Sequence, residues 1–294
     1  MRLREILLAL FVVVVWGINF VVIDIGLGTI PPLLLAALRF AIAALPAIFL
    51  PRPQVAWPRF LFIGVFLFLL QFGFLFTGMA VGLPAGLASV VIQAQAFFTG
   101  PIAAIVLGEK ISPRQFAGSV VALLGLGAIA ATAGIHDFTI TGLIFGLAAA
   151  LCWAIGNVAL RGAGKIDMLA MVCWLSIIPP LPLMALSLWM DGPAVVTHAL
   201  TTMTWGGIGA VLYIAVLSTN IGYGFWAYLL RQYPAAQVAP FSLLVPIVGI
   251  ISAALILGEH FGPVRLGGML LVFAGLVIAV APRSLLTRQR AKPA

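Results

Sequence analysis

Polar and aromatic side chains recur within long apolar segments of this chain, and their types could serve the binding of a polar substrate. Trp16 and Asn19 are three residues apart and Trp153 and Asn157 are four apart, so each pair shares one face of a helix. Polar groups in lipid are costly and usually face the interior of a helical bundle. These two aromatic-plus-amide faces therefore predict a substrate path. The alternative is that each asparagine hydrogen-bonds a neighbouring helix.

Other apolar segments carry further candidates for this path. Ser89 and Gln93 follow one helical stripe with small residues, whereas Gln95 points nearly opposite. We therefore expect Gln93 rather than Gln95 to face a cavity, with simple packing as the alternative. Trp226 and Tyr228, near the end of a segment, are more typical of an aromatic belt at the membrane interface. The remaining candidates are Gln71, Trp174, Tyr213, Asn220 and Ser242.

Few charged residues lie within the apolar segments. Arg39 is the only basic residue well inside a predicted span, so it is a candidate to attract a substrate carboxylate. The alternative is that its long side chain reaches carbonyl groups or the membrane interface. The acids lie at span ends and in loops, which leaves Glu5 or Asp24 for any proton coupling. Facilitated diffusion down a substrate gradient is the other reading.

Catalysis is a competing class of function. A membrane-embedded enzyme needs a nucleophile with a base, or a metal-binding cluster. The histidines fall in predicted loops, and the acids form no paired or metal-binding pattern. Cys152 and Cys173 both lie in predicted helices, which indicates neither a disulfide framework nor a zinc site. We expect no catalytic residue, metal or cofactor, and no repeated filter segment indicates a channel. The three histidines are His136, His198 and His260.

The composition indicates that membrane helices position these residues. Hydrophobic residues make up 64% of the chain, charged residues 7%, and the mean hydropathy is +1.24. A bilayer-spanning helix needs roughly 20 apolar residues, whereas a membrane β-strand needs about ten with alternating polarity. The long segments here favour helices. The ten predicted spans are 5–23, 31–50, 59–80, 84–107, 113–133, 140–160, 168–190, 203–230, 234–257 and 263–282.

Basic residues at the segment ends predict the orientation of the chain. Arg265 lies on the outer face, and Arg39 lies within a span. The other Lys and Arg collect on the inner face if the N-terminus is cytoplasmic, as retention of positive charge requires. The net charge of +8 then indicates topology and attraction to anionic lipid rather than to nucleic acid. The inner residues are Arg2, Arg4, Arg52, Arg59, Lys110, Arg114, Arg161, Lys165, Arg231, Arg283, Arg288, Arg290 and Lys292.

An internal repeat relates the two halves of the chain, because residues 84–126 recur at 234–276 without a gap. Each half holds five predicted spans, an odd number, so the second copy enters the membrane in the opposite sense. We predict an all-α polytopic membrane protein of ten helices in two inverted five-helix repeats, 1–134 and 138–283, with a basic cytoplasmic tail at 284–294. The repeated residues include Leu107-Gly108-Glu109 and Pro113, which return as Leu257-Gly258-Glu259 and Pro263.

Prolines within the spans predict where helices bend. Pro101 interrupts the fourth span, and Pro240 and Pro246 interrupt the ninth. Each proline removes a backbone hydrogen bond, so we interpret these positions as hinges, with static kinks as the alternative.

Signatures along essentially the whole chain are similar to those of a known family. They are Trp16 to Asn19, Arg39-Phe40, and Leu-Gly-Glu followed by proline at 107–113 and 257–263. In these the chain resembles the drug/metabolite transporter superfamily, specifically the ten-helix exporters with two EamA-type repeats. Within it, the chain is most similar to bacterial inner-membrane exporters of amino acids, including aromatic ones. The resemblance implies a central cavity lined mainly by the first, third, fourth, sixth, eighth and ninth helices.

The residue types and the resemblance together predict an exporter of amino acids and related small metabolites, working by alternating access as an uncoupled facilitator. The amide, hydroxyl and aromatic candidates suit neutral amino acids. An exporter of lipophilic or cationic drugs is the alternative, which an acid within an aromatic cage would favour. A membrane-embedded enzyme is less favoured. The expected partners are a small-molecule substrate and membrane lipids, and the oligomeric state stays open.

Overall fold

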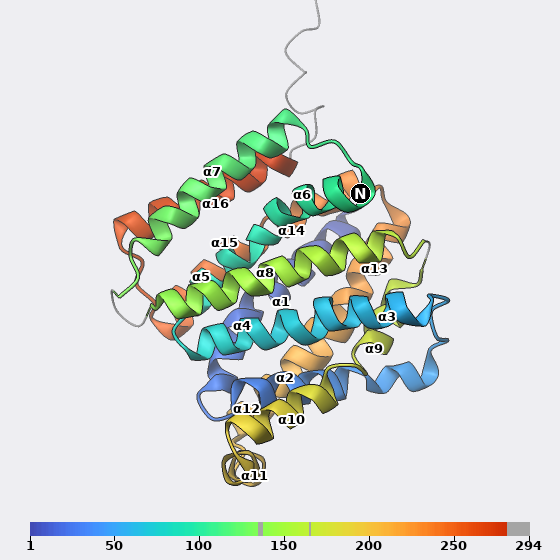
Figure 1. The fold of residues 1–294 in the computed structure, drawn as a ribbon, viewed down its shortest axis with the longest axis vertical. Coiled ribbons are helices and arrows are strands. Elements are labelled where there is room, and N and C mark those ends of the chain that lie inside the picture. Colours follow the sequence, from blue (N-terminus) through green and yellow to red (C-terminus); the bar gives the residue numbers. More distant parts are fainter. Residues whose placement is uncertain (135–137, 165, 281–294) are drawn as a thin grey trace, which may run out of the picture.

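The computed structural model describes residues 1–134, 138–164 and 166–280, and every regular element in these ranges is a helix. The helices run as inclined rods, with α7 and α16 at one edge of the bundle and α10 and α11 at the opposite edge (Figure 1). The elements are α1 (Leu3–Leu27), α2 (Pro32–Ala43), η1 (Leu45–Phe49), α3 (Trp57–Gly64), η2 (Val65–Leu70), α4 (Gln71–Ala80), α5 (Ala85–Val91), η3 (Ile92–Ala94), α6 (Gln95–Leu107), α7 (Pro113–Ala130), α8 (Ile140–Arg161), α9 (Met168–Leu175), α10 (Pro180–Met190), α11 (Pro193–Thr201), α12 (Trp205–Leu212), η4 (Tyr213–Ile221), α13 (Gly222–Gln232), α14 (Ala235–Ser242), α15 (Val245–Ser252), η5 (Ala253–Leu257) and α16 (Pro263–Val280).

Apolar length is the feature that suits these helices to a bilayer. Nine helical stretches of the described chain are long and apolar enough to cross a membrane, and the shorter apolar stretch Pro263–Ala279 lies in the last predicted span. Large apolar side chains such as Ile105, Trp205 and Leu255 are more than three-quarters exposed on the bundle surface. Helices satisfy their backbone hydrogen bonds internally, so such surfaces are compatible with lipid.

Several helices change their winding within a span. Tyr213–Ile221 and Ala253–Leu257 form π-helical turns, and Ile92–Ala94 forms a tight 3₁₀ turn between α5 and α6. Helix α6 continues through Pro101, and the 3₁₀ turn precedes this proline. Membrane helices tolerate an interior proline where neighbouring groups satisfy the freed backbone carbonyl, and a hinge at Pro101 stays a prediction.

The ninth predicted span does break between its two prolines. Helix α14 ends at Ser242, two residues after Pro240, and α15 begins at Val245 with Pro246 in its first turn. Proline in a first turn removes an amide that would have no intrahelical partner there, so Pro246 favours a new helix start.

Helix α11 corrects one expectation, because His198 lies in this short helix and not in a loop. Pro193 sits in its first turn, where proline favours helix formation, after Gly192 at φ +85°. Several earlier predictions concern residues outside the described part of the chain. These are His136, Lys165, Arg283, Arg288, Arg290, Lys292 and the tail at 284–294.

Four glycines allow α7 and α16 to pack backbone against backbone. A Cβ built at Gly118 would lie 2.5 Å from the carbonyl oxygen of Gly275, and one at Gly125 would lie 2.6 Å from that of Gly268. In the reverse direction, a Cβ built at Gly275 would lie 2.5 Å from the carbonyl oxygen of Gly118, and one at Gly268 would lie 2.7 Å from that of Gly125. Small residues at such crossings let membrane helices gain van der Waals contact. The pair therefore joins the two halves of the chain by close helix packing.

Candidate functional site

A cavity of about 340 Å³, the central cavity, lies between α1, α2, α4, α5, α8, α9, α13 and α14. Polar groups from several apolar helices gather here, where each avoids lipid. No Asp or Glu is among the described residues that line it. The predicted path residues that it brings together are Trp16, Asn19, Arg39, Gln71, Ser89, Gln93, Trp153, Asn157 and Ser242.

Arg39 brings one buried positive charge to the central cavity. Its side chain is 2% exposed, its Nε donates to Oγ1 of Thr219 at 3.1 Å, and its guanidinium carbon lies 4.2 Å from the ring centroid of Phe72. The side chain therefore does not extend to the membrane interface. Its buried Nη1 has no hydrogen-bond partner among the described residues. A buried guanidinium with an unused donor is poised to bind an acceptor that enters the cavity.

Asn19 adds an unused acceptor to the same cavity. It is 7% exposed, and its buried Oδ1 has no partner in the described part of the chain. Its neighbour Trp16 donates from Nε1 to the carbonyl oxygen of Ser218 at 3.0 Å. The Trp16 ring lies 5.2 Å from the ring of Tyr223 and 5.3 Å from that of Trp226, centroid to centroid. An aromatic cluster therefore forms one wall of the cavity beside Asn19.

Both glutamines of the fourth predicted span line the central cavity, so the expectation that only Gln93 would face it is wrong. The 3₁₀ turn Ile92–Ala94 lies between α5 and α6 and changes the angular spacing that an uninterrupted α-helix would impose. Gln95 accepts a hydrogen bond through Oε1 from Nδ2 of Asn157 at 3.3 Å. Ser89 is fully buried, and its Oγ donates to the carbonyl oxygen of Gly86 at 2.7 Å.

Three predicted path residues do not line the central cavity and instead link helices to one another. Trp174 donates from Nε1 to the carbonyl oxygen of Leu50 at 3.0 Å. Tyr213 and Asn220 donate to backbone carbonyl oxygens in α1 and α2, each at 3.0 Å. Both lie in the π-helical stretch η4, whose wider turns alter the face that each side chain occupies. The acceptors of Tyr213 and Asn220 are Val15 and Ala43.

Among cavity residues with hydrogen-bonding side chains, the sequence prediction missed four: Gln95, Ser218, Tyr223 and Trp226. Trp226 was expected at the membrane interface, yet its ring packs against Trp16. The helical spacing of Tyr223 and Trp226, three residues apart, was the signal that could have placed them on one face.

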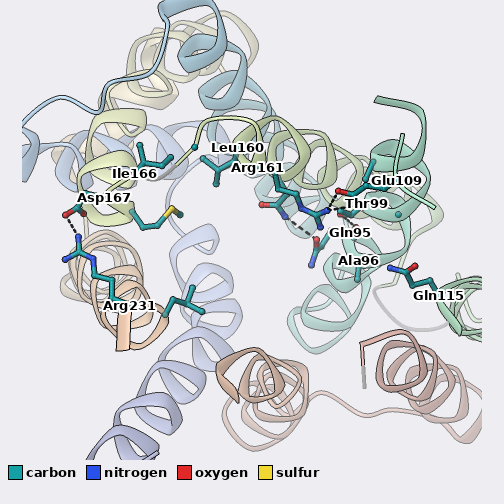
Figure 2. Close-up of a pocket in the computed structure, with 16 residues that line it drawn as sticks. Gln95, Ala96, Thr99, Glu109, Gln115, Leu160, Arg161, Ile166, Asp167 and Arg231 are labelled. Carbon is teal, nitrogen blue, oxygen red and sulfur yellow. Dashed lines mark hydrogen bonds and ion pairs between the residues drawn. The ribbon is translucent and has the colours of Figure 1, made fainter. Parts of the chain in front are cut away.

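A second, larger cavity of about 1070 Å³, the vestibule, is lined by the residues drawn in Figure 2. Arg161 pairs with Glu109 at 3.2 Å on one side, and Arg231 pairs with Asp167 on the other (Figure 2). Both pairs are about half-exposed, so each contributes little stability. The two cavities share Gln95, Asn157, Leu160, Met168 and Leu230, so they lie directly next to each other.

Asp167 also holds the start of α9, because its Oδ1 accepts from the amides of Leu169 and Ala170. Partial burial alone would raise the pKa of this carboxyl. The two backbone hydrogen bonds and the Arg231 guanidinium outweigh burial and hold the pKa below its ordinary value. The carboxylate therefore stays charged at the rim of the vestibule.

The opposite end of the bundle is closed by a contact between the repeats. Glu259 accepts from the amide of Gly86 through Oε2 at 3.1 Å and Oε1 at 3.4 Å. Burial raises the pKa of the Glu259 carboxyl, although this amide opposes the rise. A third cavity of about 360 Å³, similar in volume to the central cavity, is lined here by Asp24, His260 and Arg265 and shares no lining residue with it.

Close helix packing reinforces this closure. A Cβ at Gly17 would lie 2.5 Å from side-chain carbons of Val248, and one at Gly249 would lie 2.5 Å from the side chain of Ser89. Helices α1, α5 and α15 therefore meet without room for larger side chains. The central cavity thus adjoins the vestibule, and closely packed helices separate it from the cavity at the Glu259 end.

Comparisons with known proteins agree on one family. The model of the EamA-like transporter family matches residues 3–131 and 140–281. A protein of Salmonella typhimurium described as a probable amino-acid metabolite efflux pump is 43% identical over 286 residues, which cover 95% of this chain and 96% of the relative. A protein of Streptantibioticus cattleyicolor described as a probable terminal-alkyne amino-acid exporter is 29% identical, over 95% of this chain and 94% of its own.

A solved crystal structure matches the fold across 99% of this chain and 100% of its own, with a TM-score of 0.62 at 18% identity. That likeness supports the helical fold alone. The long apolar helices and the transporter relatives agree that this is a multi-pass membrane protein. On the family match and the identity across nearly the whole length, the chain belongs to the EamA-like transporter family, within the drug/metabolite transporter superfamily.

Proposed function

We propose that this protein exports amino acids and related small metabolites from the cytoplasm through the central cavity. The observation that carries the proposal is the charge and hydrogen-bonding pattern of that cavity. Arg39 offers an unused donor and Asn19 an unused acceptor, and no Asp or Glu is among the described lining residues. The printed descriptions of the relatives, which name amino-acid metabolites and an amino-acid exporter, support the same substrate class.

The two ends of an α-amino acid suit the two unused groups. A carboxylate would accept from Nη1 of Arg39, as a charge-assisted hydrogen bond at a buried side chain. An ammonium would donate to Oδ1 of Asn19 and face the ring of Trp16. The substrate side chain would then contact Phe72 and other apolar residues, which supports a broad range of substrates.

A lipophilic or cationic drug suits this cavity less well. A buried guanidinium repels a cation, and the described lining offers no carboxylate to balance the charge. The aromatic cluster at Trp16 alone contributes only about 0.5–2 kcal/mol to a cation. The drug-exporter alternative therefore depends on residues that the cavity does not supply.

Transport in this proposal uses alternating access. Ten membrane helices form two inverted five-helix repeats, residues 1–134 and 138–283, and the site between them opens to one side at a time. The break between Pro240 and Pro246 serves as a hinge. The vestibule, rimmed by Arg161 and Arg231, faces the cytoplasm of a bacterial inner membrane, as do both termini and the tail at 284–294.

Substrate movement without chemical conversion completes the proposal. The relatives are described as transporters, and the arrangement of the central cavity serves binding rather than catalysis. No carboxylate is among the described residues that line it, so we propose facilitated diffusion down the substrate gradient without a proton relay there.

Uptake by proteoliposomes tests this function. A panel of labelled amino acids, including aromatic amino acids, Thr and Met, is supplied with and without an imposed pH gradient. We expect uptake that follows the substrate gradient alone. Strict dependence on the pH gradient would contradict the facilitator and direct attention to Glu5 and Asp24. Transport of lipophilic cations without any amino acid would support the drug exporter instead.

Two matched substitutions test the role of Arg39. Loss of a charged hydrogen bond, about 1.5–3 kcal/mol, corresponds to roughly 10- to 100-fold in affinity, so Arg39→Gln should raise the KM for amino acids by that factor. Arg52→Gln is the control, because Arg52 stacks 3.6 Å from the ring centroid of Trp57 outside the cavity. Equal KM values for a monodisperse Arg39→Gln protein and the wild type would refute the assignment.

A further inference from the structure

Two equivalent glutamates stand at opposite ends of the cavity system. Glu109 and Glu259 occupy the same place in the repeated stretches 84–126 and 234–276. Their turns are also alike. Each follows a glycine at φ +69°, and the amide of each glutamate donates to an alanine carbonyl oxygen six residues earlier, at 3.4 Å for Glu109 and 3.3 Å for Glu259. Similar backbone geometry therefore presents both side chains.

The two glutamates nevertheless have different partners. Glu259 is bound to the amide of Gly86 at the start of α5, which belongs to the other repeat. Glu109 pairs with Arg161 at the vestibule rim, where both side chains are half-exposed. Among the described contacts, the end with the interrepeat contact is closed, and the end where Glu109 pairs with Arg161 is open.

The repeat identifies the counterpart of the Gly86 contact. Gly86 corresponds to position 236 in the second copy, because Pro84-Ala85 returns as Pro234-Ala235. That position lies in the first turn of α14, whose backbone amides lack intrahelical partners. The counterpart of the Glu259 contact is therefore a hydrogen bond from the start of α14 to Glu109.

We propose that Glu109 and Glu259 are alternating latches, of which one is closed in each state of the transport cycle. In the conformation described above, Glu259 holds α5 and seals its end. In the opposite conformation, Glu109 leaves Arg161, binds the backbone at the start of α14 and closes the vestibule. The inference rests on the alternating access of the proposed function but not on the identity of the substrate.

Arg161 explains why the Glu109 latch is open here. Arg161 lies eight residues after Trp153, and Asp24 lies eight residues after Trp16, the equivalent tryptophan. Arg161 attracts Glu109 away from a helix start. At the equivalent position near Glu259, Asp24 repels the glutamate, and the attraction there comes from Arg265 on α16. Because Arg161 and Asp24 carry opposite charges at equivalent positions, the Glu109 latch and the Glu259 latch differ in stability.

Cysteine labelling without substrate tests the latches. The reporter is Ser89→Cys in a chain whose native Cys152 and Cys173 are replaced by alanine. Ser89 is fully buried and packs against Gly249 at the closed end, so a membrane-impermeant maleimide added from the Glu259 side reaches it only when that end opens. Gly100→Cys is the reciprocal reporter, because it faces the vestibule and a Cβ there meets no atom within 4 Å.

Three substitutions give distinct expectations. Glu259→Ala should speed Ser89→Cys labelling about tenfold, because a charged hydrogen bond is lost from the closed state. Glu109→Ala should slow it, since the opposite state loses its latch. Arg161→Ala should speed it, because Glu109 is released. A simple ion pair that holds the vestibule open would instead give the last two substitutions the same sign.

The outcomes separate the alternatives. Unchanged labelling in Glu259→Ala, or equal signs for Glu109→Ala and Arg161→Ala, would overturn the proposal. If Glu259→Ala is not monodisperse, Glu259→Gln replaces it and should label at an intermediate rate, because an amide oxygen can still accept from Gly86 without charge. Gly100→Cys labelling from the vestibule side should change in the opposite direction in each variant. If the wild-type protein proves not to transport amino acids, these expected labelling rates stay the same, because they do not depend on the substrate.

Discussion

The crossing of α7 and α16 gives the sharpest prediction of stability. A Cβ at Gly125 would lie 2.6 Å from the carbonyl oxygen of Gly268 and 2.7 Å from the amide nitrogen of Val272. Ordinary carbon contacts lie at about 3.5–4.0 Å, and both neighbours are backbone atoms that cannot rotate away. Gly125→Ala must therefore push the two helices apart, although alanine is the better helix former.

The magnitude follows from two opposing effects. Overpacking in a well-packed interior typically costs about 1–3 kcal/mol. Alanine in a helix interior gains up to about 1 kcal/mol over glycine. Gly127→Ala is the matched control on the same helix, because a Cβ there meets no atom within 4 Å. We expect the free energy of unfolding of Gly127→Ala to equal or exceed that of the wild type. We expect that of Gly125→Ala to fall by about 1–2 kcal/mol.

Equilibrium unfolding of purified protein in mixed micelles measures both variants. The free energies of unfolding should differ between Gly125→Ala and Gly127→Ala, with the first less stable. Equal stability of the two variants would refute the backbone-to-backbone packing of α7 on α16. Amino-acid uptake per folded molecule should remain in both, because neither glycine lines the central cavity.

Two further predictions concern the cavity wall. Trp16→Phe keeps an aromatic ring but loses the donor to Ser218, so substrate affinity should fall about two- to tenfold in binding titrations, whereas no change would contradict the assigned wall. Gln95→Leu should weaken uptake as much as Gln93→Leu, since both line the cavity, and an effect of Gln93→Leu alone would support the uninterrupted helix.

The sequence predicted the gathering of polar residues better than their exact faces. Asn19, Arg39 and Asn157 converge on one cavity because amide and guanidinium groups in apolar helices avoid lipid, and this rule needs no coordinates. The sequence prediction missed Gln95 because it assumed regular α-helical winding. It missed Trp226 because it placed this residue at the membrane interface. The 3₁₀ turn at 92–94 and the π-helical stretch at 213–221 change that winding, and neither has a sequence signature as strong as proline.

The periodicity of the sequence also could not predict the hydrogen-bond partners of the polar side chains. Tyr213 and Trp174 have the residue types of a substrate path, yet each donates to a backbone carbonyl oxygen on another helix. Which polar group binds a neighbour and which stays unused depends on distances of a few tenths of an ångström between helices. The pattern alone therefore predicts a set of candidates, and packing selects among them.

The repeat itself carries a last prediction, because two identical copies would make the two states of the transporter equal in energy. Position 86 is glycine, whereas its counterpart at position 236 is alanine. A Cβ at Gly86 would meet Oε2 of Glu259 at 2.9 Å and Cζ of Phe261 at 2.6 Å, so glycine permits the close latch seen at this end. Gly86→Ala should weaken that latch and speed Ser89→Cys labelling from the Glu259 side. Gly100→Ala, with open space around its Cβ, should leave the rate unchanged. Equal rates in both variants would mean that the two states differ in energy for reasons other than the fit of Glu259 against α5.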